Sequence, residues 1–324
     1  MTSSPEPPRG RLPDFFIVGH PKSGTTALYE MLRRHPQIFM PDLKEPRWFA
    51  PDLRPRFQPA AAGPPRLALP QTLEEYRALF APAAPGELVG EASPSYLRSK
   101  AAAGLIAAAR PDARIIAVLR EPASFLRSLH LEFVQNHVEH EQDLRRAFEK
   151  ERLEPGPDGG EGPPATRYSD RVRYVEQLER YAAVFPREQM LVLIYDDFRR
   201  DNEGTVRTVL RFLGVDEGAP IALVEANPTV HVRSLRADRF VRSIYAGQGP
   251  LAGALKSALR RMPGGGALAA ALRGVRRGAL YGAPRAPDEE FMNELRRRFR
   301  GEVEALGEYL ERDLLHEWGY ERLD

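Results

Sequence analysis

The residues best suited to chemistry lie in one segment, FFIVGHPKSGTTALYEML, at residues 15–32. Gly19 and Gly24 are separated by four residues, and they stand between an apolar run and a helical pattern. This is the spacing of a phosphate-binding loop, in which a turn joins a buried strand to the start of a helix. The backbone N–H groups of such a turn bind phosphate oxygens, and the positive end of the helix adds to the attraction. The segment therefore predicts a site for a phosphate-bearing ligand.

The lysine of this loop is displaced from its usual position. Thr25 stands where a nucleotide-hydrolysing loop carries its lysine, and the positive charge lies three residues upstream at Lys22. A nucleotide hydrolase needs a lysine that bridges two phosphates and a hydroxyl that holds Mg²⁺. The displaced lysine instead suits a donor with one phosphate at the loop and one anionic group to transfer. The candidate donor-binding residues of this loop are Lys22, Ser23, Gly24, Thr25 and Thr26.

A second candidate phosphate site lies in RIIAVLREPASFLRSLHLEF, at residues 114–133. Arg120 ends an apolar run that predicts a strand, and Ser128 lies two turns into the helix that should follow. The guanidinium offers a bidentate fork and the serine a hydroxyl donor, so the two side chains can converge on one phosphate. We therefore expect Arg120 and Ser128 to bind phosphate together.

Short apolar runs and helical patterns alternate along the chain, and these elements must position the loop and Arg120. Strands are predicted at 14–19, 87–91, 114–119 and 190–195. Helices are predicted at 25–34, 98–109, 123–137, 141–151, 168–184 and 202–213. This alternation predicts an α/β fold with a parallel sheet that is covered on both faces. Such sheets bind ligands at the carboxyl ends of their strands, where Lys22 and Arg120 are expected.

The strand, the PKSGTT turn and the helix together resemble the 5′-phosphosulfate loop of the sulfotransferases, which use 3′-phosphoadenosine-5′-phosphosulfate (PAPS). The segment at 114–133 resembles the 3′-phosphate-binding segment of the same family. The resemblance, closest to bacterial and heparan-type members, covers about 14–215. It also covers LGEYLERDLLHEWGY (306–320), which looks like the closing helix of the family. It implies a P-loop-like parallel sheet flanked by helices, with PAPS as donor substrate, PAP as product and no metal requirement.

Two further segments match the family and imply the remaining roles. KEPRWF (44–49) resembles the K-E-x-x-x-F element in which the glutamate is the catalytic base, which implies Glu45. Lys22 is then the residue that stabilises the leaving phosphate. GEASPSYL (90–97) resembles the G-E-x-S-P-x-Y segment, but Ala92 stands where a lysine is common. That departure removes a cation from the acceptor side and weakens the case for a glycosaminoglycan acceptor.

Two histidines are alternatives to Glu45 as the catalytic base. Sulfuryl transfer requires a group within hydrogen-bond reach that takes the acceptor's proton. His130 and His137 lie on or just past the predicted helix that carries Ser128, so either could replace Glu45 in this role.

The overall composition limits the class of protein. Of the 324 residues, 42% are hydrophobic and 28% charged, which excludes wholesale disorder and a membrane-embedded chain. There is no cysteine, so disulfides and thiol chemistry are excluded, and no apolar run is long enough to span a bilayer. From these features we expect a cytoplasmic protein. Residues 1–13 are predicted to be a disordered lead, and 14–324 a single domain with helical insertions.

Charge is distributed unevenly along the chain. Residues 239–287 carry nine basic side chains and no acidic one, although the whole chain has a formal net charge of only +2. Two Ala/Leu-rich stretches in this basic block could each form an amphipathic helix. A helical pair packed on the sheet, a lid over the acceptor cleft and a surface for anionic lipid or a charged glycolipid remain open. Nucleic acid is not expected, because no base-stacking aromatic set accompanies the charge.

Two other functions remain as alternatives. A P-loop small-molecule kinase is one, because Asp196 and Asp197 end a predicted strand as Mg²⁺ ligands would. A non-catalytic protein that binds anions or a membrane surface through the basic block is the other. For the sulfotransferase, a small-molecule, carbohydrate or lipid-linked acceptor fits the same donor machinery. The sequence does not choose among these acceptors, and it does not give the oligomeric state.

Overall fold

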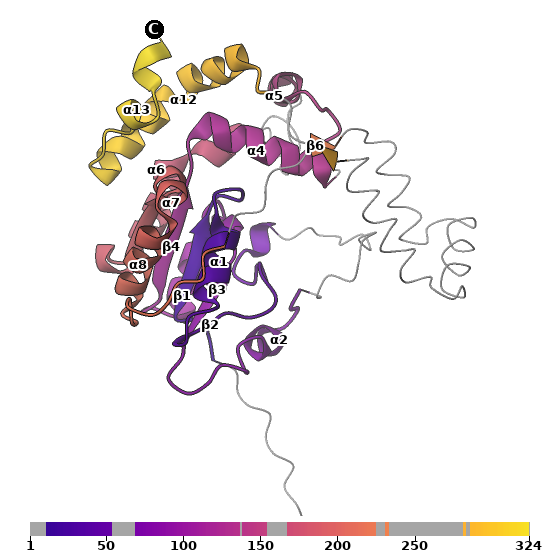
Figure 1. Cartoon of the computed structure of the whole chain (residues 1–324). Coiled ribbons are helices and arrows are strands. Elements are labelled where there is room, and N and C mark those ends of the chain that lie inside the picture. The colour runs from indigo at the N-terminus through magenta and orange to yellow at the C-terminus, as the bar shows by residue number, and fades with distance from the viewer. Residues whose placement is uncertain are drawn as a thin grey trace, which may run out of the picture.

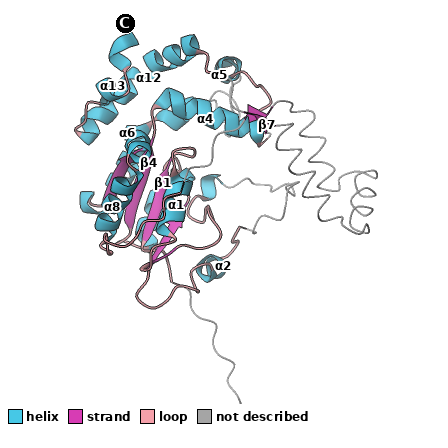
Figure 2. Ribbon diagram, viewed as in Figure 1, coloured by secondary structure: helices cyan, strands magenta, loops and turns pink. Residues whose placement is uncertain are grey.

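Five parallel strands form the central sheet of the protein, whose computed structural model is shown in Figure 2. Their order across the sheet is β2-β3-β1-β4-β5. The strands are β1 (Phe15–Gly19), β2 (Ile38–Phe39), β3 (Leu88–Ala92), β4 (Arg114–Leu119) and β5 (Met190–Ile194). The structure describes residues 11–53, 69–136, 138–153, 167–224, 231–232, 281–282 and 286–323. The predicted α/β fold with a parallel sheet is confirmed.

Helices cover both faces of the sheet (Figure 1). Alternate side chains of the fully buried β1 pack against these two layers. Phe15 and Ile17 belong to one hydrophobic cluster, and Phe16 and Val18 belong to a second. The first cluster is completed by α1 (Thr25–Leu32) and α8 (Asn202–Leu213). The second is completed by α3 (Ala102–Ala109), α4 (Pro122–Gln135), α6 (Tyr174–Ala182) and α12 (Glu289–Leu310). Burial on both faces explains why the strand sequences read as continuous apolar runs.

The remaining elements are short. They are α2 (Leu73–Ala78), α5 (Leu144–Leu153), α7 (Tyr195–Arg200), α13 (Leu314–Glu317), the antiparallel pair β6 (His231–Val232) and β7 (Tyr281–Gly282), and 3₁₀ turns that include η2 (Pro94–Tyr96) and η3 (Ser169–Val172). The two-residue strand β2 was not predicted, because a pair of residues carries no periodicity.

Several predicted helices begin or end elsewhere. The helix predicted at 98–109 begins at Ala102, and the Ser99 hydroxyl before it accepts hydrogen bonds from the N–H groups of Ala101 and Ala102 at 3.2 and 3.0 Å. The stretch predicted as one helix at 168–184 is divided into η3 and α6. The last strand ends at Ile194, one residue earlier than predicted, because α7 begins at Tyr195.

The C-terminal tail is not the single helix that 306–320 suggested. The long helix α12 begins at Glu289 and ends at Leu310, and Glu311 then adopts a left-handed conformation with φ of 56°. The Arg312 N–H turns back to the Gly307 carbonyl at 2.9 Å, which closes the helix end. From α13 the chain continues to Tyr320, whose hydroxyl donates to Glu121 Oε1 at 2.7 Å, so the C-terminus is tied to the start of α4.

No helix in the described ranges is both long enough and apolar enough to cross a membrane. Most of the basic block at 239–287, with its two predicted amphipathic helices, lies outside the described residues.

Candidate functional site

The turn between β1 and α1 has the backbone geometry that the spacing predicted. Gly19 has φ of 128°, and a Cβ there would lie 2.4 Å from the Val118 carbonyl oxygen of β4, so only glycine fits. Gly24 has φ of 81° and directly precedes the first residue of α1, Thr25. Lys22 is also left-handed, with φ of 64°. This turn lies at the carboxyl end of the central strand, the expected position for a ligand.

The hydroxyl side chains of the turn differ in exposure. Ser23 is fully buried, and its Oγ has no hydrogen-bond partner among the described residues. Thr25 is buried, whereas Thr26 is exposed. A buried hydroxyl without a protein partner costs free energy unless a ligand satisfies it. The Ser23 Oγ therefore fits a phosphate oxygen bound in the turn.

Arg120 joins the second predicted phosphate site to the first. Its Nη1 donates a hydrogen bond to the Lys22 carbonyl oxygen at 2.8 Å, and its guanidinium lies over the Tyr195 ring at 4.8 Å. Burial lowers the pKa of Arg120, against the opposing effect of nearby acidic groups such as Asp196. Ser128 is buried two turns further along α4. The two segments predicted to bind phosphate thus meet at the carboxyl ends of the neighbouring strands β1 and β4.

Glu45 lies in the segment after β2, next to the end of β3. Its N–H donates to the Ala92 carbonyl at 3.0 Å, and the Arg47 N–H donates to Ser93 Oγ at 3.2 Å. Both Glu45 and Arg47 are left-handed, with φ of 60° and 54°. Backbone strain of this kind is concentrated at functional sites. The two segments that matched the family, 44–49 and 90–97, are therefore joined by hydrogen bonds.

Two cations hold the Glu45 carboxylate. Lys44 Nζ lies 3.1 Å from Oε1, and Arg47 Nη2 lies 2.5 Å from Oε2. Burial alone would raise the pKa of Glu45, but the charges of Lys44 and Arg47 outweigh it and lower the pKa to about 2. The side chain keeps 30% of its surface exposed, so it is accessible to a substrate.

The other glutamate of this region, Glu91, has a structural environment. It is fully buried and accepts hydrogen bonds from the Tyr76 hydroxyl, from Ser93 Oγ at 2.6 Å and from the Tyr96 hydroxyl at 3.2 Å. Burial raises its pKa to about 7. Ala92, where a lysine is common in the family, has its side chain in the hydrophobic cluster beneath α1.

Three charged residues of this region, Arg98, Glu132 and Arg171, were not predicted from the sequence as site residues. Glu132 on α4 has an Oε2 atom that is buried and without a hydrogen-bond partner among the described residues. Arg171 of η3 is buried over the Phe133 ring, and burial together with the charge of Arg98 lowers its pKa to about 9. For Glu132 one signal was present: it follows Ser128 by four residues and therefore shares its helix face. Arg98 lies before α3 and Arg171 lies in η3, so neither is on the regular helix that the sequence predicted for it.

His130, one of the two histidines considered as alternative bases, has both ring nitrogens engaged by other groups. His130 Nδ1 lies 2.8 Å from the Tyr168 hydroxyl and Nε2 lies 3.1 Å from the Gln142 carbonyl, so both nitrogens are engaged. Burial lowers the pKa of His130. His137 lies outside the described residues. His20, beside the turn, is stacked against Phe125 at 4.4 Å.

The aspartates that supported a kinase lie in the first turn of α7 rather than at the strand end. Asp197 is ion-paired, with its Oδ2 2.6 Å from Arg312 Nη1. Within the described ranges, no group of three or more His, Cys, Asp or Glu side chains is arranged to hold a metal ion.

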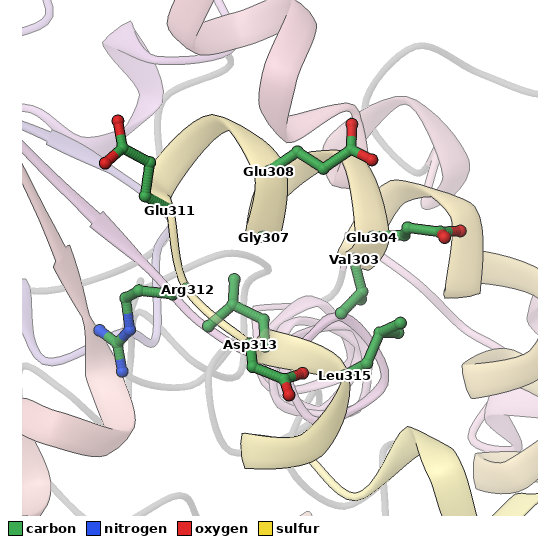
Figure 3. Close-up of a pocket in the computed structure, with 9 residues that line it drawn as sticks. Val303, Glu304, Gly307, Glu308, Glu311, Arg312, Asp313 and Leu315 are labelled. Carbon is green, nitrogen blue, oxygen red and sulfur yellow. The ribbon is translucent and has the colours of Figure 1, made fainter.

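A hollow of about 410 Å³ lies between α12 and α13 (Figure 3). Val303 and Leu315 point into it, whereas the carboxylates of Glu304 and Glu308 point outward. None of the candidate donor-binding residues lines it. The candidate donor-binding residues therefore lie at the carboxyl ends of the strands and not in this hollow.

Comparison with known proteins gives one consistent relationship. The model of the sulfotransferase family matches residues 13–218. Mouse carbohydrate sulfotransferase 15 is 26% identical over 250 residues, with 63% of this chain and 44% of the relative covered. Human heparan sulfate glucosamine 3-O-sulfotransferase 6 is 28% identical over 212 residues, with 64% and 54% covered. The chain thus spans about half the length of the curated relatives it matches.

A solved structure supports the same relationship. The crystal structure of a sulfotransferase from Alicyclobacillus acidocaldarius is 31% identical, with a TM-score of 0.58, and the match covers 73% of this chain and 94% of that one. The family model, which matches more than half of the chain, includes β1, the PKSGTT turn and Arg120. The chain belongs to the sulfotransferase family.

Proposed function

We propose that the protein transfers a sulfuryl group from PAPS to a hydroxyl or amine of a small-molecule, carbohydrate or lipid-linked acceptor. The observation that carries the proposal is the hydrogen bond from Arg120 Nη1 to the Lys22 carbonyl at 2.8 Å. It joins the segment that resembles the 5′-phosphosulfate loop to the segment that resembles the 3′-phosphate site. A ligand with phosphates at both ends of an adenosine would span the two segments, which supports PAPS over a donor with a single phosphate.

Separate residues of the site bind the donor and stabilise its leaving group. The turn N–H groups, the start of α1 and the hydroxyls of Ser23 and Thr25 bind the 5′-phosphate. Lys22 neutralises the charge that develops on the leaving phosphate oxygen as the bond to sulfur breaks. Arg120 and Ser128 hold the 3′-phosphate. This arrangement keeps the sulfur in line with the acceptor oxygen, so the transfer is a single displacement.

Glu45 is the proton acceptor in this proposal. Its carboxylate is partly exposed and lies in the segment hydrogen-bonded to the end of β3, beside the carboxyl end of β1. It takes the proton of the acceptor as the new oxygen–sulfur bond forms. The names of the curated relatives are those of carbohydrate and heparan sulfate sulfotransferases, which favours a carbohydrate among the open acceptor classes.

Thermal unfolding in the presence of PAP tests the donor half of the proposal. A ligand that binds only the folded state at 100 times its Kd stabilises it by about 2.7 kcal/mol. We therefore expect PAP to raise the Tm by several degrees, and ATP with Mg²⁺ to leave it unchanged. A shift with ATP and Mg²⁺ but not with PAP would favour the kinase, and no shift with either would favour a non-catalytic protein.

A further inference from the structure

Glu132 differs from the other two glutamates of the region in having no partner for a buried oxygen. Glu91 is satisfied by three hydroxyl donors, and Glu45 by two cations. In contrast, Glu132 Oε2 is buried and has no hydrogen-bond partner among the described residues. A buried carboxylate oxygen without a donor is costly, and it is retained where it has a use. Glu132 is therefore a candidate for contact with a substrate group.

The position of α4 places Glu132 toward the reaction site. The start of the helix is fixed to the β1–α1 turn, because Arg120 donates to the Lys22 carbonyl and the Phe125 ring stacks on His20 at 4.4 Å. Glu132 lies one turn beyond Ser128 and on the same helix face. The helix face that should hold the 3′-phosphate therefore continues to Glu132.

Charged groups from three other segments act on Glu132. They are Lys22 from the β1–α1 turn, Lys44, Glu45 and Arg47 from the segment after β2, and Arg171 from η3. The same lysine that the proposed function assigns to the leaving group is thus in electrostatic reach of Glu132, and so is the proposed base.

Glu45 and Glu132 have different affinities for a proton. Burial raises the pKa of Glu132, and the charge of Glu45 raises it further, although Lys22 and the other cations act in the opposite direction. The pKa of Glu45 is lowered to about 2 by Lys44 and Arg47, which outweigh its burial. Two interacting carboxylates titrate as a pair, and the proton resides on the more basic member. Separated pKa values of this kind distinguish the acid and base roles in known active sites.

Building on the proposed function, we propose that Glu45 and Glu132 form a proton-accepting pair, and that the proton released by the acceptor comes to rest on Glu132. The acceptor O–H or N–H bond breaks as the bond to sulfur forms, and the bond from sulfur to the 5′-phosphate oxygen breaks. Its electron pair stays on PAP, beside Lys22. Glu45 takes the proton first and hands it to Glu132, so that Glu45 is again ionised and ion-paired. Glu132 releases the proton to water when the products leave.

Calorimetric titration with PAP tests this assignment without an acceptor. The PAP phosphate neutralises Lys22, so Glu132 loses the cation that most favours its ionised form and takes up a proton. Titrations between pH 5 and 7 in buffers of different ionisation enthalpy give the number of protons taken up per PAP. The phosphates of PAP contribute equally to all variants, so the difference between variants is the measured quantity.

We expect Glu132→Gln to take up about 0.3 to 1 fewer protons than the wild type at the pH of maximal difference. Glu132→Asp, which keeps a carboxylate at this position, should restore most of the wild-type proton uptake. Glu149→Gln alters an exposed glutamate on α5 and serves as the matched control.

Equal proton uptake by Glu132→Gln and the wild type would overturn the assignment while leaving the proposed function intact. Loss of PAP binding in both Glu132→Gln and Glu132→Asp would also overturn it, since it would show a structural role. Failure of the wild type to bind PAP would instead refute the proposed function itself.

Discussion

The Glu45 carboxylate is ion-paired at both oxygens before any substrate is present. The pairs hold it in a fixed orientation and keep it ionised at neutral pH. They also make it a weak base, since its pKa is lowered to about 2 by Lys44 and Arg47 despite burial. An acceptor hydroxyl that displaces one of these cations would meet a carboxylate that is already oriented. The basicity of Glu45 therefore depends on whether Lys44 and Arg47 stay paired with it.

Replacing Glu45 tests its assignment as the base. Glu45→Gln keeps the size of the side chain but cannot accept the proton, so transfer should fall at least about 100-fold, the usual contribution of a general base. PAP affinity, measured by calorimetry, should stay within about twofold, because the donor residues lie on other segments. Turnover close to wild type in this variant would move the base to a histidine, His130 or His137.

Replacing Arg120 tests the link between the two phosphate segments. Arg120→Lys keeps the charge but loses the bidentate fork and the hydrogen bond to the Lys22 carbonyl. Loss of one charged hydrogen bond costs about 1.5 to 3 kcal/mol, so PAP should bind roughly 10- to 100-fold more weakly. The exposed Arg200→Lys is the matched control. An unchanged Kd for PAP in Arg120→Lys would show that the guanidinium does not contact the ligand.

Some site residues were predictable and others were not. Lys22 and Arg120 follow neighbouring parallel strands, and such strands end at the same edge of the sheet, so their proximity could be expected. Glu45 was assigned only through the family resemblance, because it lies in an irregular segment. The cations on its carboxylate and the unpaired oxygen of Glu132 depend on side-chain packing that one sequence does not specify.

At the scale of elements, the end of β3 is closed by a polar network inside the core. The Glu91 side chain is fully buried and receives three hydrogen bonds. The hydroxyl of Ser93, which donates to Glu91, also accepts from the Arg47 N–H. The network therefore connects the end of a strand to the segment that carries Glu45.

The pH dependence of stability tests this network. Burial raises the pKa of Glu91 from 4.5 to about 7 in the folded state, so folding favours its protonated form. Its contribution to stability is full below about pH 4.5 and is lost as the pH rises through 7. The shift of about 2.5 pH units corresponds to about 3 kcal/mol. Relative to Glu91→Gln, the wild type should lose about this much free energy of unfolding between pH 4.5 and pH 7.5.

Chemical denaturation at a series of pH values measures that difference, with Glu149→Gln as the control. A free-energy difference between wild type and Glu91→Gln that stays constant with pH would contradict a raised pKa at this position.

The elements themselves were largely predictable. The strands at the centre of the sheet were found because burial on both faces leaves fully apolar runs, as in β4, where the predicted bounds match. Helix ends were less predictable, since they depend on local hydrogen bonds such as those that the Ser99 hydroxyl accepts before α3. The end of α12 at Leu310 depends on the left-handed conformation of Glu311, and glutamate is not a residue type that predicts this conformation.

At the scale of the whole molecule, the donor site and the basic block are separate in the sequence. Lys22 and Arg120 lie in residues 1–238, which carry one more acidic than basic side chain, whereas 239–287 carry nine basic residues. The residues assigned to the donor site therefore include none from the basic block. The block remains a candidate for the acceptor side.

Neutralising the basic block tests this separation. Replacing Arg260, Arg261, Arg273, Arg276 and Arg277 by Gln should leave the Kd for PAP within about twofold, because none of them is among the residues assigned to donor binding. Partitioning onto anionic vesicles and activity on a lipid-linked acceptor should fall if the block faces a membrane. A tenfold weaker Kd for PAP at physiological salt would contradict the separation.

Incubation of the protein with sulfur-labelled PAPS and a metabolite extract tests whether the protein transfers a sulfuryl group at all. We expect one class of extract compound to gain the mass of a sulfuryl group while PAP is released in equal amount. Lys22→Ala should lower this rate about 100-fold, because it removes the stabilisation of the leaving phosphate. Release of labelled product by Lys22→Ala at the wild-type rate, or PAP binding without any labelled product from the wild type, would contradict the account.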